Sequence, residues 1–427
     1  MENEKYRNRL IDWKVDQYLQ AFGAVCIQGP KWCGKTWTSE HHAESEVKIQ
    51  DPAGNYQNRR LANESPSAVL QGARPRLIDE WQDVPSLWDA VRAETDRTGE
   101  KGQFILTGSS TPLSRDRKPM HSGAGRIARL DMHTMSLYEA GFSDGRVSLQ
   151  DICMNKAPDL MTGEVTLDRL ADYILRGGWP ENTDRPLEIA RLLPQQYINA
   201  ILGEDVSRMD NTRRDLSKMN RLLCSLARNE STTVSDRVLQ KDISDADGIL
   251  IDRKTISDYL DVYRRLFLIS DTPAYSSSMR SSVRVKQQSK RHLCDPSLSA
   301  ALMHCTMDSL MNDLNTMGFL FEALVERDLA IYAEAFDAHL YHYQDYKNRE
   351  IDAVIELEDG SWCGFEIKLG ASQIQPAVEN LKRIQNEFAA DEKAKQPRAM
   401  CVICGLSRAA YYDKSGIYIV PLTSLKD

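Results

Sequence analysis

Eight consecutive residues, from Gly29 to Thr36, have the composition and spacing of a phosphate-binding loop. They follow the pattern G-x-x-x-x-G-K-T. In such a loop the backbone N–H groups surround phosphate oxygens, and the following helix adds the positive end of its dipole. Lys35 is expected to reach the β- and γ-phosphates of ATP, and Thr36 to place its hydroxyl on Mg²⁺. The sequence therefore predicts ATP contacts from Gly29, Pro30, Lys31, Trp32, Cys33, Gly34, Lys35 and Thr36.

An acidic pair, Asp79 and Glu80, ends a short apolar stretch at residues 75–78. This is the Walker B arrangement, and the spacing from the phosphate loop leaves room for one more strand and helix between them. Asp79 is expected to hold Mg²⁺ through water. Glu80 is expected to orient and deprotonate the water that attacks the phosphate, which makes it a catalytic residue together with Lys35.

Two further polar groups follow buried strand patterns. The apolar stretch at residues 103–107 ends in Thr107 and Ser109, whose hydroxyls are candidates to hydrogen-bond the γ-phosphate or the attacking water. Arg126 follows a Gly-rich turn and is a candidate arginine finger that reaches the γ-phosphate of a neighbouring subunit, with Arg129 as the substitute. A surface arginine in a turn is the alternative interpretation of Arg126.

The C-terminal third carries a second set of charged residues, in the order E…D…E-x-K. Glu322 lies in a helical pattern, Asp352 in one strand pattern, and Glu366 and Lys368 in the next. Period-two alternation places Glu366 and Lys368 on one face of their strand, and a hairpin brings Asp352 close to them. Two carboxylates there can hold Mg²⁺ while the lysine activates a water. A fold kept for binding or assembly, with these acids as ordinary surface pairs, is the alternative.

A basic segment without acidic residues runs from residue 276 to residue 291. A basic hairpin tip can bind phosphates with salt-dependent and largely sequence-independent affinity. A solvated hairpin tip explains the composition equally well. If the segment binds DNA, the contacts are expected from Arg280, Arg284, Lys286, Lys290 and Arg291.

These residues need an α/β scaffold to bring them together. The phosphate loop follows an apolar strand pattern at residues 24–27, and further strands are expected at residues 47–50, 75–79 and 103–107. Helical periodicity at residues 167–210 predicts a lid over the nucleotide. Three helical patterns and two strand patterns between residues 213 and 295 predict a winged helix with a basic wing.

Five segments together resemble a prokaryotic AAA+ P-loop ATPase family whose members carry a C-terminal domain of unknown function. The family's Gly-Gly-aromatic-Pro-Glu signature also matches residues 177–181. The resemblance implies an AAA+ fold, with the strand at 103–107 between the P-loop strand and the Walker B strand. It also implies ring oligomers, which we expect to be hexamers. The five segments are residues 28–36, 77–81, 105–110, 122–126 and 135–139.

The C-terminal acids and lysine resemble restriction-endonuclease-like PD-(D/E)xK nucleases, a fold shared with archaeal Holliday-junction resolvases. The expected fold is therefore α/β, with four parts in chain order. They are an AAA+ P-loop core at 1–150, a helical lid at 165–212, a winged helix at 213–298 and a PD-(D/E)xK nuclease-like domain at 299–427.

Composition limits the class of protein. The 427 residues have the composition of a globular protein and a formal net charge of −8, which argues against a generally basic nucleic-acid binder but not against a local basic surface. The N-terminus lacks a secretory signal pattern and no apolar run reaches the length of a membrane span, so we expect a cytoplasmic location and no membrane partner. The nine scattered cysteines favour reduced thiols.

The sequence leads to two hypotheses about function. In the first, the chain is an ATP- and Mg²⁺-dependent AAA+ ATPase that acts on DNA as a homo-oligomeric ring, with branched or repair and recombination DNA as the candidate substrates and DNA cleavage as an open question. In the second, it is a nucleotide-gated switch or scaffold that binds a protein partner, and its nuclease-like domain does not cut.

Overall fold

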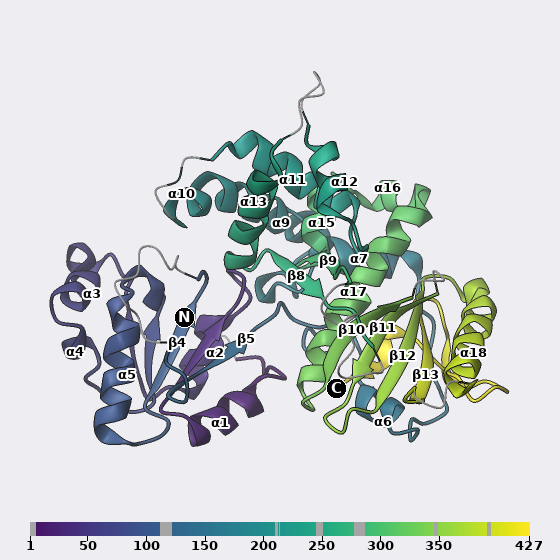
Figure 1. The fold of residues 1–427 in the computed structure, drawn as a ribbon, viewed down its shortest axis with the longest axis horizontal. Coiled ribbons are helices and arrows are strands. Elements are labelled where there is room, and N and C mark those ends of the chain that lie inside the picture. The colour runs from purple at the N-terminus through teal and green to yellow at the C-terminus, as the bar shows by residue number, and fades with distance from the viewer. Residues whose placement is uncertain are drawn as a thin grey trace. The chain divides into compact units, whose positions relative to one another are not determined.

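The computed structural model describes residues 6–111, 122–209, 212, 214–244, 251–276, 287–345, 349–390 and 394–427. Its chain forms two compact units, which Figure 1 shows as ribbons. The N-terminal unit comprises residues 1–134, 203–214 and 261–268, and the C-terminal unit comprises residues 135–202, 215–260 and 269–427. None of the helices in the described residues combines the length and apolar character needed to cross a lipid bilayer.

The N-terminal unit is built on a five-stranded, wholly parallel sheet in the order β2-β3-β4-β1-β5. Strand β4 lies between β1, which leads into the phosphate loop, and β3, which ends in the acidic pair. This is the position that the family resemblance implies for it. The strands are β1 (Ala24–Gln28), β2 (Ser45–Lys48), β3 (Arg76–Asp79), β4 (Phe104–Gly108) and β5 (Ile127–Asp131).

The strands of this sheet carry apolar side chains on both sides. Helices therefore pack on both faces of the sheet. On β1, Ala24 and Cys26 belong to one buried cluster, and Val25 and Ile27 belong to the other. Helix α5 supplies Leu87, Trp88 and Val91 to the first cluster, and α1 supplies Val15 and Leu19 to the second. The helices of this unit are α1 (Asp12–Ala21), α2 (Lys35–His42), α3 (Ala53–Glu64), α4 (Pro66–Val69), the 3-10 turn η1 (Trp81–Asp83) and α5 (Ser86–Thr98).

Between residues 135 and 268 the chain passes from one unit to the other several times, and two of these changes fall inside a helix. The C-terminal unit stops at Leu202 and the N-terminal unit resumes at Gly203, within the π-helical turn η3 (Ile201–Asp205). The second crossing lies between Leu260 and Asp261 in α13 (Arg253–Arg265). The other helices of residues 160–312 are α7 (Leu167–Arg176), η2 (Pro180–Asn182), α8 (Leu187–Ala190), α9 (Leu192–Ala200), α10 (Val206–Met209), α11 (Leu216–Arg228), α12 (Asp236–Asp242), α15 (Pro296–Leu302) and α16 (Met307–Asn312).

The expected pair of strands after the third helical pattern is present as the antiparallel hairpin β8 (Ile269–Thr272) and β9 (Lys290–Leu293). Helices α11 and α12 begin at the side-chain caps Asp215 and Ser235, which accept hydrogen bonds from backbone N–H groups in the first turn. The tip of the hairpin, with Arg280, Arg284 and Lys286, lies outside the described residues.

The C-terminal unit contains a seven-stranded mixed sheet in the order β10-β11-β12-β13-β15-β14-β7. Strands β10, β11 and β12 are antiparallel neighbours, and β13 pairs with β12 in parallel. Helix α17 contacts β10, β11 and β12, and α18 packs apolar residues on the sheet. The elements are α17 (Leu314–Glu334), β10 (His339–Gln344), β11 (Glu350–Glu356), β12 (Trp362–Lys368), η4 (Ala371–Gln373), α18 (Ile374–Ala390), β13 (Pro397–Cys404), β14 (Ala409–Tyr412) and β15 (Tyr418–Val420).

A distant segment completes this unit. Strand β7 (Leu160–Met161) forms the far edge of the seven-stranded sheet beside β14. Strand β6 (Val147–Ser148) leads into α6 (Leu149–Cys153) and pairs in parallel with β16 (Leu425–Lys426), which follows the short turn η5 (Leu422–Ser424). Residues 145–166, which lack a clear apolar period in the sequence, therefore add structure to the C-terminal unit.

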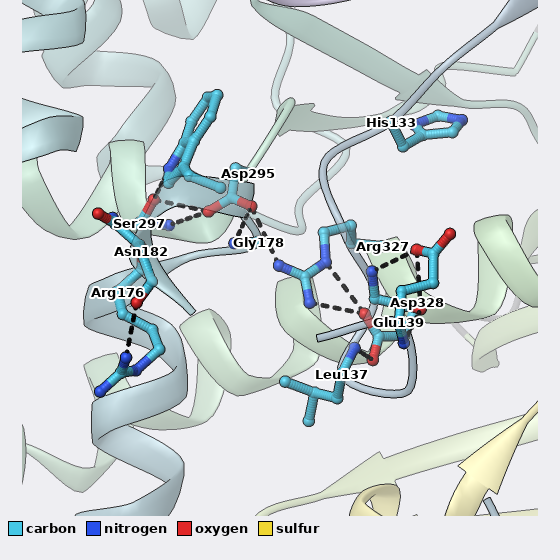
Figure 2. A network of polar contacts seen from close by, with 12 residues as sticks. His133, Leu137, Glu139, Arg176, Gly178, Asn182, Asp295, Ser297, Arg327 and Asp328 are labelled. Atoms are coloured by element: carbon cyan, nitrogen blue, oxygen red, sulfur yellow. Dashed lines mark hydrogen bonds and ion pairs between the residues drawn. The ribbon is translucent and has the colours of Figure 1, made fainter. Parts of the chain in front are cut away.

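A buried ion-pair network joins four segments of the C-terminal unit (Figure 2). The Arg327 guanidinium lies 3.0 Å from an Asp295 carboxylate oxygen and 2.7 Å from one of Asp328. Backbone N–H groups of Gly178 and Leu137 donate to the same two acids, at 2.9 and 3.0 Å. Because both charges of each pair are buried, removing one partner alone would leave an uncompensated charge in the interior.

The Gly-Gly-aromatic segment at residues 177–179 lies beside this network, and its backbone closely approaches that of Met135. A Cβ atom on Gly178 would lie 2.1 Å from the carbonyl oxygen of Met135, so no larger residue fits without movement of the chain. Trp179 follows with its indole N–H donating to Ser297 at 3.0 Å, fully buried. Two motifs that are more than forty residues apart in the sequence thus meet here.

Candidate active site

The phosphate loop joins β1 to α2 and is held on one side by Arg9. Arg9 donates one N–H to the Cys33 carbonyl at 2.8 Å and another to the His133 carbonyl at 3.0 Å. A Cβ atom on Gly29 would lie 2.1 Å from the carbonyl oxygen of Met132, so the loop can pass β5 this closely only with glycine there. Trp32 has a left-handed backbone with φ of 61°, which a non-glycine residue adopts only when its surroundings impose it.

The two reactive residues of the loop point to different partners. The ammonium of the buried Lys35 donates to the Pro30 carbonyl at 2.7 Å, across the loop from its own helix. The Thr36 hydroxyl donates to Asp79 Oδ1 at 3.0 Å. The structure therefore brings together the two residues, Thr36 and Asp79, that the sequence predicts for Mg²⁺.

Thr107 joins the ends of β3 and β4. Its hydroxyl donates to Asp79 Oδ1 at 2.6 Å and accepts the backbone N–H of Glu80 at 2.9 Å. Both threonines, 36 and 107, therefore donate to the same carboxylate oxygen. Thr107 is fully buried, so its position is fixed by the packing of the sheet.

The Glu80 carboxylate is held from β4 and from its own turn. Ser109 donates its hydroxyl to Glu80 Oε2 at 2.7 Å, and the amide of Gln82 donates to the same oxygen. Glu80 has a left-handed backbone with φ of 59°, directly after the last residue of β3. Sequence reasoning named Ser109 as a sensor candidate but missed Gln82, whose only signal was its place two residues after Glu80.

The chemistry of these donors fits a magnesium nucleotide. Mg²⁺ usually takes one or two protein oxygens and keeps water or phosphate oxygens in its other positions. A threonine hydroxyl beside an aspartate carboxylate meets that requirement, and Lys35 supplies the positive charge for phosphate oxygens. Across the residues that the structure describes, no three or more His, Cys, Asp or Glu side chains are grouped as a metal site.

Arg126 and Arg129 are both exposed and have different partners. Arg126 is half-exposed and forms an ion pair with Asp96 of α5, which also pairs with Arg92 at 2.7 Å. Arg129 lies 4.6 Å from the ring centroid of Trp88 and donates to Gln28 at 3.3 Å. The exposed ion pair of Arg126 with Asp96 contributes little free energy.

The C-terminal charged residues also meet. The Lys368 ammonium lies 2.9 Å from Asp352 Oδ2 and 2.7 Å from Glu366 Oε2, across the antiparallel pair β11–β12. Asp352 also accepts the Ile367 N–H at 2.7 Å, and Asn380 of α18 donates to Glu366 at 2.8 Å. Burial raises the pKa of Glu366 to about 7, and the neighbouring Asp352 adds to this effect.

Lys290, which the sequence analysis names as an expected DNA contact, connects Glu322 to the same region. The Lys290 ammonium is 2.6 Å from Glu322, 3.0 Å from Glu326 and 3.0 Å from the Asp352 carbonyl oxygen. Burial lowers the pKa of Lys290, but these acids outweigh it and hold the pKa well above its usual value. Burial also raises the pKa of Glu322 to about 8. Sequence reasoning missed Glu326, although it lies one helical turn after Glu322 on the same face of α17.

The structure buries Lys290 and Arg291, the two described residues among the expected DNA contacts. Only 1% of Lys290 is exposed, and its three donor positions face three protein oxygens. Arg291 is 9% exposed and pairs with Asp236 of α12. Alternation along β9 does not place either side chain in solvent, because both faces of this short strand are covered.

Comparisons with known families agree with the first site. Residues 21–141 match a family model described as an AAA domain. This segment is similar to AAA-type P-loop domains. Residues 167–309 and 317–425 match two further families, each described only as a domain of unknown function, DUF8612 and DUF4143. The AAA domain therefore contains all the predicted P-loop and Walker B residues, and two uncharacterised domains follow it.

Similar whole chains are known from mycobacteria. The uncharacterized protein Rv2008c of Mycobacterium tuberculosis and the uncharacterized protein Mb2031c of Mycobacterium bovis are each 25% identical over 360 residues, which is 83% of this chain and 72% of theirs. Among solved structures, the Walker-type ATPase PABY2304 of Pyrococcus abyssi aligns with 70% of this chain and 97% of its own, at 10% identity and a TM-score of 0.44. The DNA clamp loader delta protein YqeN of Bacillus subtilis aligns with 60% of this chain and 88% of its own, at 11% identity and a TM-score of 0.22.

Proposed function

We propose that this protein is an Mg²⁺-dependent ATPase of the AAA+ type that works as a homo-oligomeric ring, with a hexamer as the expected size. The observation that carries this proposal is the shared carboxylate of Asp79. It accepts hydrogen bonds from Thr36 of the phosphate loop and from Thr107 of the sensor strand, while Ser109 holds Glu80 beside them. One acid thus connects the three elements that a phosphoryl-transfer site requires.

The residues have separate tasks in hydrolysis. Backbone N–H groups of the loop and Lys35 bind the phosphates. Thr36 and Asp79 would hold Mg²⁺, and the bound ion would neutralise charge that develops on the phosphate oxygens. Glu80 orients a water and takes its proton as the water oxygen bonds to the γ-phosphorus. The bond from that phosphorus to the bridging oxygen breaks, and ADP leaves with the electron pair.

Arg126 is proposed to act in trans, on the nucleotide of a neighbouring subunit. Its guanidinium is half-exposed, and the exposed pair with Asp96 contributes little free energy, so exchange of Asp96 for a phosphate costs little. An arginine that reaches a neighbour's γ-phosphate also gives a reason for ring assembly, since each site is then incomplete in a single subunit.

We propose that the ATPase acts on DNA, with branched DNA and repair intermediates as the candidate substrates. Its support is the basic tip with Arg280, Arg284 and Lys286, together with the nuclease-like order of Glu322, Asp352, Glu366 and Lys368 on α17, β11 and β12. Lys290 and Arg291 no longer contribute to that support, since they are buried.

A second candidate function is a nucleotide-gated switch or scaffold that binds a protein partner and does not cut DNA. The observation that favours it is the pairing of every predicted nuclease acid with an internal ammonium. Lys368 bridges Asp352 and Glu366, and Lys290 holds Glu322. A metal ion that entered between Asp352 and Glu366 would have to displace the partly exposed Lys368, and one at Glu322 would have to displace the buried Lys290.

One experiment separates these proposals. ATP hydrolysis by the purified protein is measured alone and with single-stranded, duplex and four-way-junction DNA, beside Lys35→Ala and the exposed control Lys101→Ala. We expect Lys35→Ala to remove turnover and Lys101→Ala to retain it. Stimulation by one DNA structure supports the DNA-driven ring, and equal rates with every DNA favour the switch. Absence of turnover in the wild-type protein contradicts the ATPase proposal itself.

DNA cleavage is tested separately. Supercoiled and junction DNA are incubated with Mg²⁺ or Mn²⁺ and the wild-type protein or Asp352→Ala. Nicking that Asp352→Ala removes assigns a nuclease function to the C-terminal domain. Nicking that persists in the variant identifies a contaminant.

A further inference from the structure

The phosphate loop is held on a second side by an acid that lies more than 170 residues away in the sequence. Lys31 Nζ lies 2.5 Å from Asp205 Oδ1. The Asp205 side chain is 10% exposed and that of Lys31 is 36% exposed. Both residues belong to the N-terminal unit, to which residues 203–214 return after the excursion through residues 135–202.

Asp205 occupies a special place in its helix. It is the last residue of the π-helical turn Ile201–Asp205, which separates α9 from α10. Single π-helical turns are rare in proteins and occur frequently at functional sites. The boundary between the two compact units falls between Leu202 and Gly203, inside the same turn. The contact to the phosphate loop is thus made just where the chain enters the N-terminal unit.

We propose that Asp205 is a positioning residue of the nucleotide site. Its carboxylate holds Lys31 and thereby restrains the phosphate loop, so that nucleotide binding and the conformation of the chain at the π-helical turn depend on each other. This inference rests on the proposed ATPase function, and it assigns to the segment 201–205 a direct part in regulating that site.

The loop conformation needs such a restraint. Lys31 directly precedes Trp32, whose left-handed backbone persists only if the surrounding structure over-determines it. Arg9 fixes the far end of the loop through the Cys33 carbonyl, and Asp205 fixes the near end through Lys31. The two anchors lie on either side of Trp32. Loss of the Asp205 anchor would allow the N–H groups of the loop to leave the arrangement that binds phosphates.

The coupling is reciprocal by necessity. If the ion pair of Lys31 with Asp205 favours the loop conformation that binds nucleotide, then bound nucleotide favours the ion pair by the same factor. The π-helical turn therefore receives a restraint whose strength depends on the occupancy of the phosphate loop. A change in the occupancy of the phosphate loop is in this way transmitted to the π-helical turn.

The test compares Asp205→Ala, Asp205→Glu, Lys31→Ala and the double variant Lys31→Ala/Asp205→Ala with the wild-type protein. The matched control is Glu204→Gln, which changes the adjacent, exposed acid. Nucleotide affinity is measured with a fluorescent ATP analogue, and kcat and KM are measured separately. Because the pair is partly exposed, we expect Asp205→Ala to weaken nucleotide binding and raise KM by about 3- to 10-fold, with kcat changed less than about twofold.

The double variant and the conservative variant distinguish positioning from a structural role. We expect the double variant to bind nucleotide as Lys31→Ala does, since the second change removes a partner that is already lost. Asp205→Glu should recover part of the affinity. The proposal is overturned if the losses of nucleotide affinity in Lys31→Ala and Asp205→Ala multiply in the double variant, because the two residues then act independently. It is also overturned by an Asp205→Ala protein that unfolds at a lower temperature without nucleotide yet binds nucleotide normally. If the wild-type protein binds nucleotide but does not hydrolyse it, the ATPase proposal fails. The nucleotide affinities of the single and double variants still test the role of Asp205 in that case.

Discussion

The hydroxyl of Thr107 lies 2.6 Å from Oδ1 of Asp79, the same oxygen that accepts the hydroxyl of Thr36. This contact exists because β4, which carries Thr107, lies directly beside β3, which carries Asp79. Thr107 also accepts the N–H of Glu80, so one side chain sets the position of both Walker B acids. A disturbance of Thr107 should therefore reach Asp79, the proposed metal ligand, and Glu80, the proposed base, together.

Replacement of Thr107 by valine should lower kcat for ATP hydrolysis by about 10- to 100-fold, because it removes two hydrogen bonds of the partly buried acidic pair while keeping the side-chain shape. Thr107→Ser keeps the hydroxyl and should retain most of the activity. The measurement is steady-state phosphate release at saturating ATP. Wild-type turnover by Thr107→Val would show that the bridge to Asp79 has no role in the reaction.

Replacement of Glu80 by glutamine should leave ATP bound but unhydrolysed, with a loss of about 100-fold or more in kcat, since it removes the general base. The nearby acid Asp83 offers a matched control, because Asp83→Asn changes a carboxylate of the same turn that has no assigned role. Nucleotide affinity and turnover are measured on both variants. A Glu80→Gln protein that loses ATP affinity, with turnover per bound ATP unchanged, would contradict the assigned role.

Two inactive variants should restore each other's activity if Arg126 acts in trans. Lys35→Ala lacks a working phosphate loop, and Arg126→Ala lacks the proposed finger. In a mixed ring, the intact loop of an Arg126→Ala subunit meets the intact arginine of a Lys35→Ala subunit. We expect the mixture to hydrolyse ATP faster than either variant alone, as measured over a series of mixing ratios. A mixture that only averages the two residual rates would place Arg126 outside the neighbouring site.

Replacement of Lys290 by methionine should destabilise the C-terminal unit by about 3–5 kcal/mol, because it leaves Glu322 and Glu326 buried without their counter-ion. The triple variant Lys290→Met/Glu322→Gln/Glu326→Gln should recover part of that loss, since no buried charge then lacks a partner. Chemical denaturation measures the free energy of unfolding, with the exposed Lys382→Met as control. A Lys290→Met protein as stable as the wild type would mean that the side chain reaches solvent.

The stability of the C-terminal unit should fall as the pH rises from 6.5 to 8.5. Burial raises the pKa of Glu366 to about 7 and that of Glu322 to about 8, whereas both titrate near 4.5 in an unfolded chain. In this range the folded state holds more protons than the unfolded state, and each such proton contributes a slope of at most about 1.4 kcal/mol per pH unit. The pKa of His292 is also raised, despite its burial, by Glu326 and Glu230, so its contribution has the same sign.

Denaturation curves at four pH values test this dependence. Glu366→Gln should make the slope of unfolding free energy against pH less steep. Asp359→Asn should leave the slope unchanged, because the Ser361 hydroxyl lowers the pKa of Asp359 and its carboxylate is ionised throughout the range. A slope that is the same in Glu366→Gln and in the wild-type protein would contradict the raised pKa of Glu366.

Local patterns were sufficient to predict the parts of the fold that depend on neighbouring residues. The phosphate loop, the acidic pair after β3 and the β11–β12 hairpin each follow from a short stretch with its own periodicity or spacing. The place of β4 between β1 and β3 came from the family resemblance, and the structure confirms it. The gathering of Asp352, Glu366 and Lys368 followed from strand alternation and a hairpin turn.

Long-range partners could not be predicted in the same way. Lys290 looked like one more cation of a basic segment, because nothing near it in the sequence indicates the acids of α17. Asp205 lies inside the helical pattern at residues 167–210, and nothing near it in the sequence indicates its contact with Lys31. In both cases the decisive information is the packing of distant elements, and a charged residue whose partner is distant in sequence has the same local pattern as one in solvent.

The buried ammonium of Lys290 also constrains how this protein can evolve. It belongs to β9, before the proposed boundary at residue 298, whereas both of its glutamates belong to α17, beyond it. A lineage that replaced the lysine would need to replace Glu322 and Glu326 as well, so these three positions should covary among relatives. Recombination that exchanged only the last domain between distant relatives would separate the lysine from its acids, and the two domains should therefore be inherited as one piece.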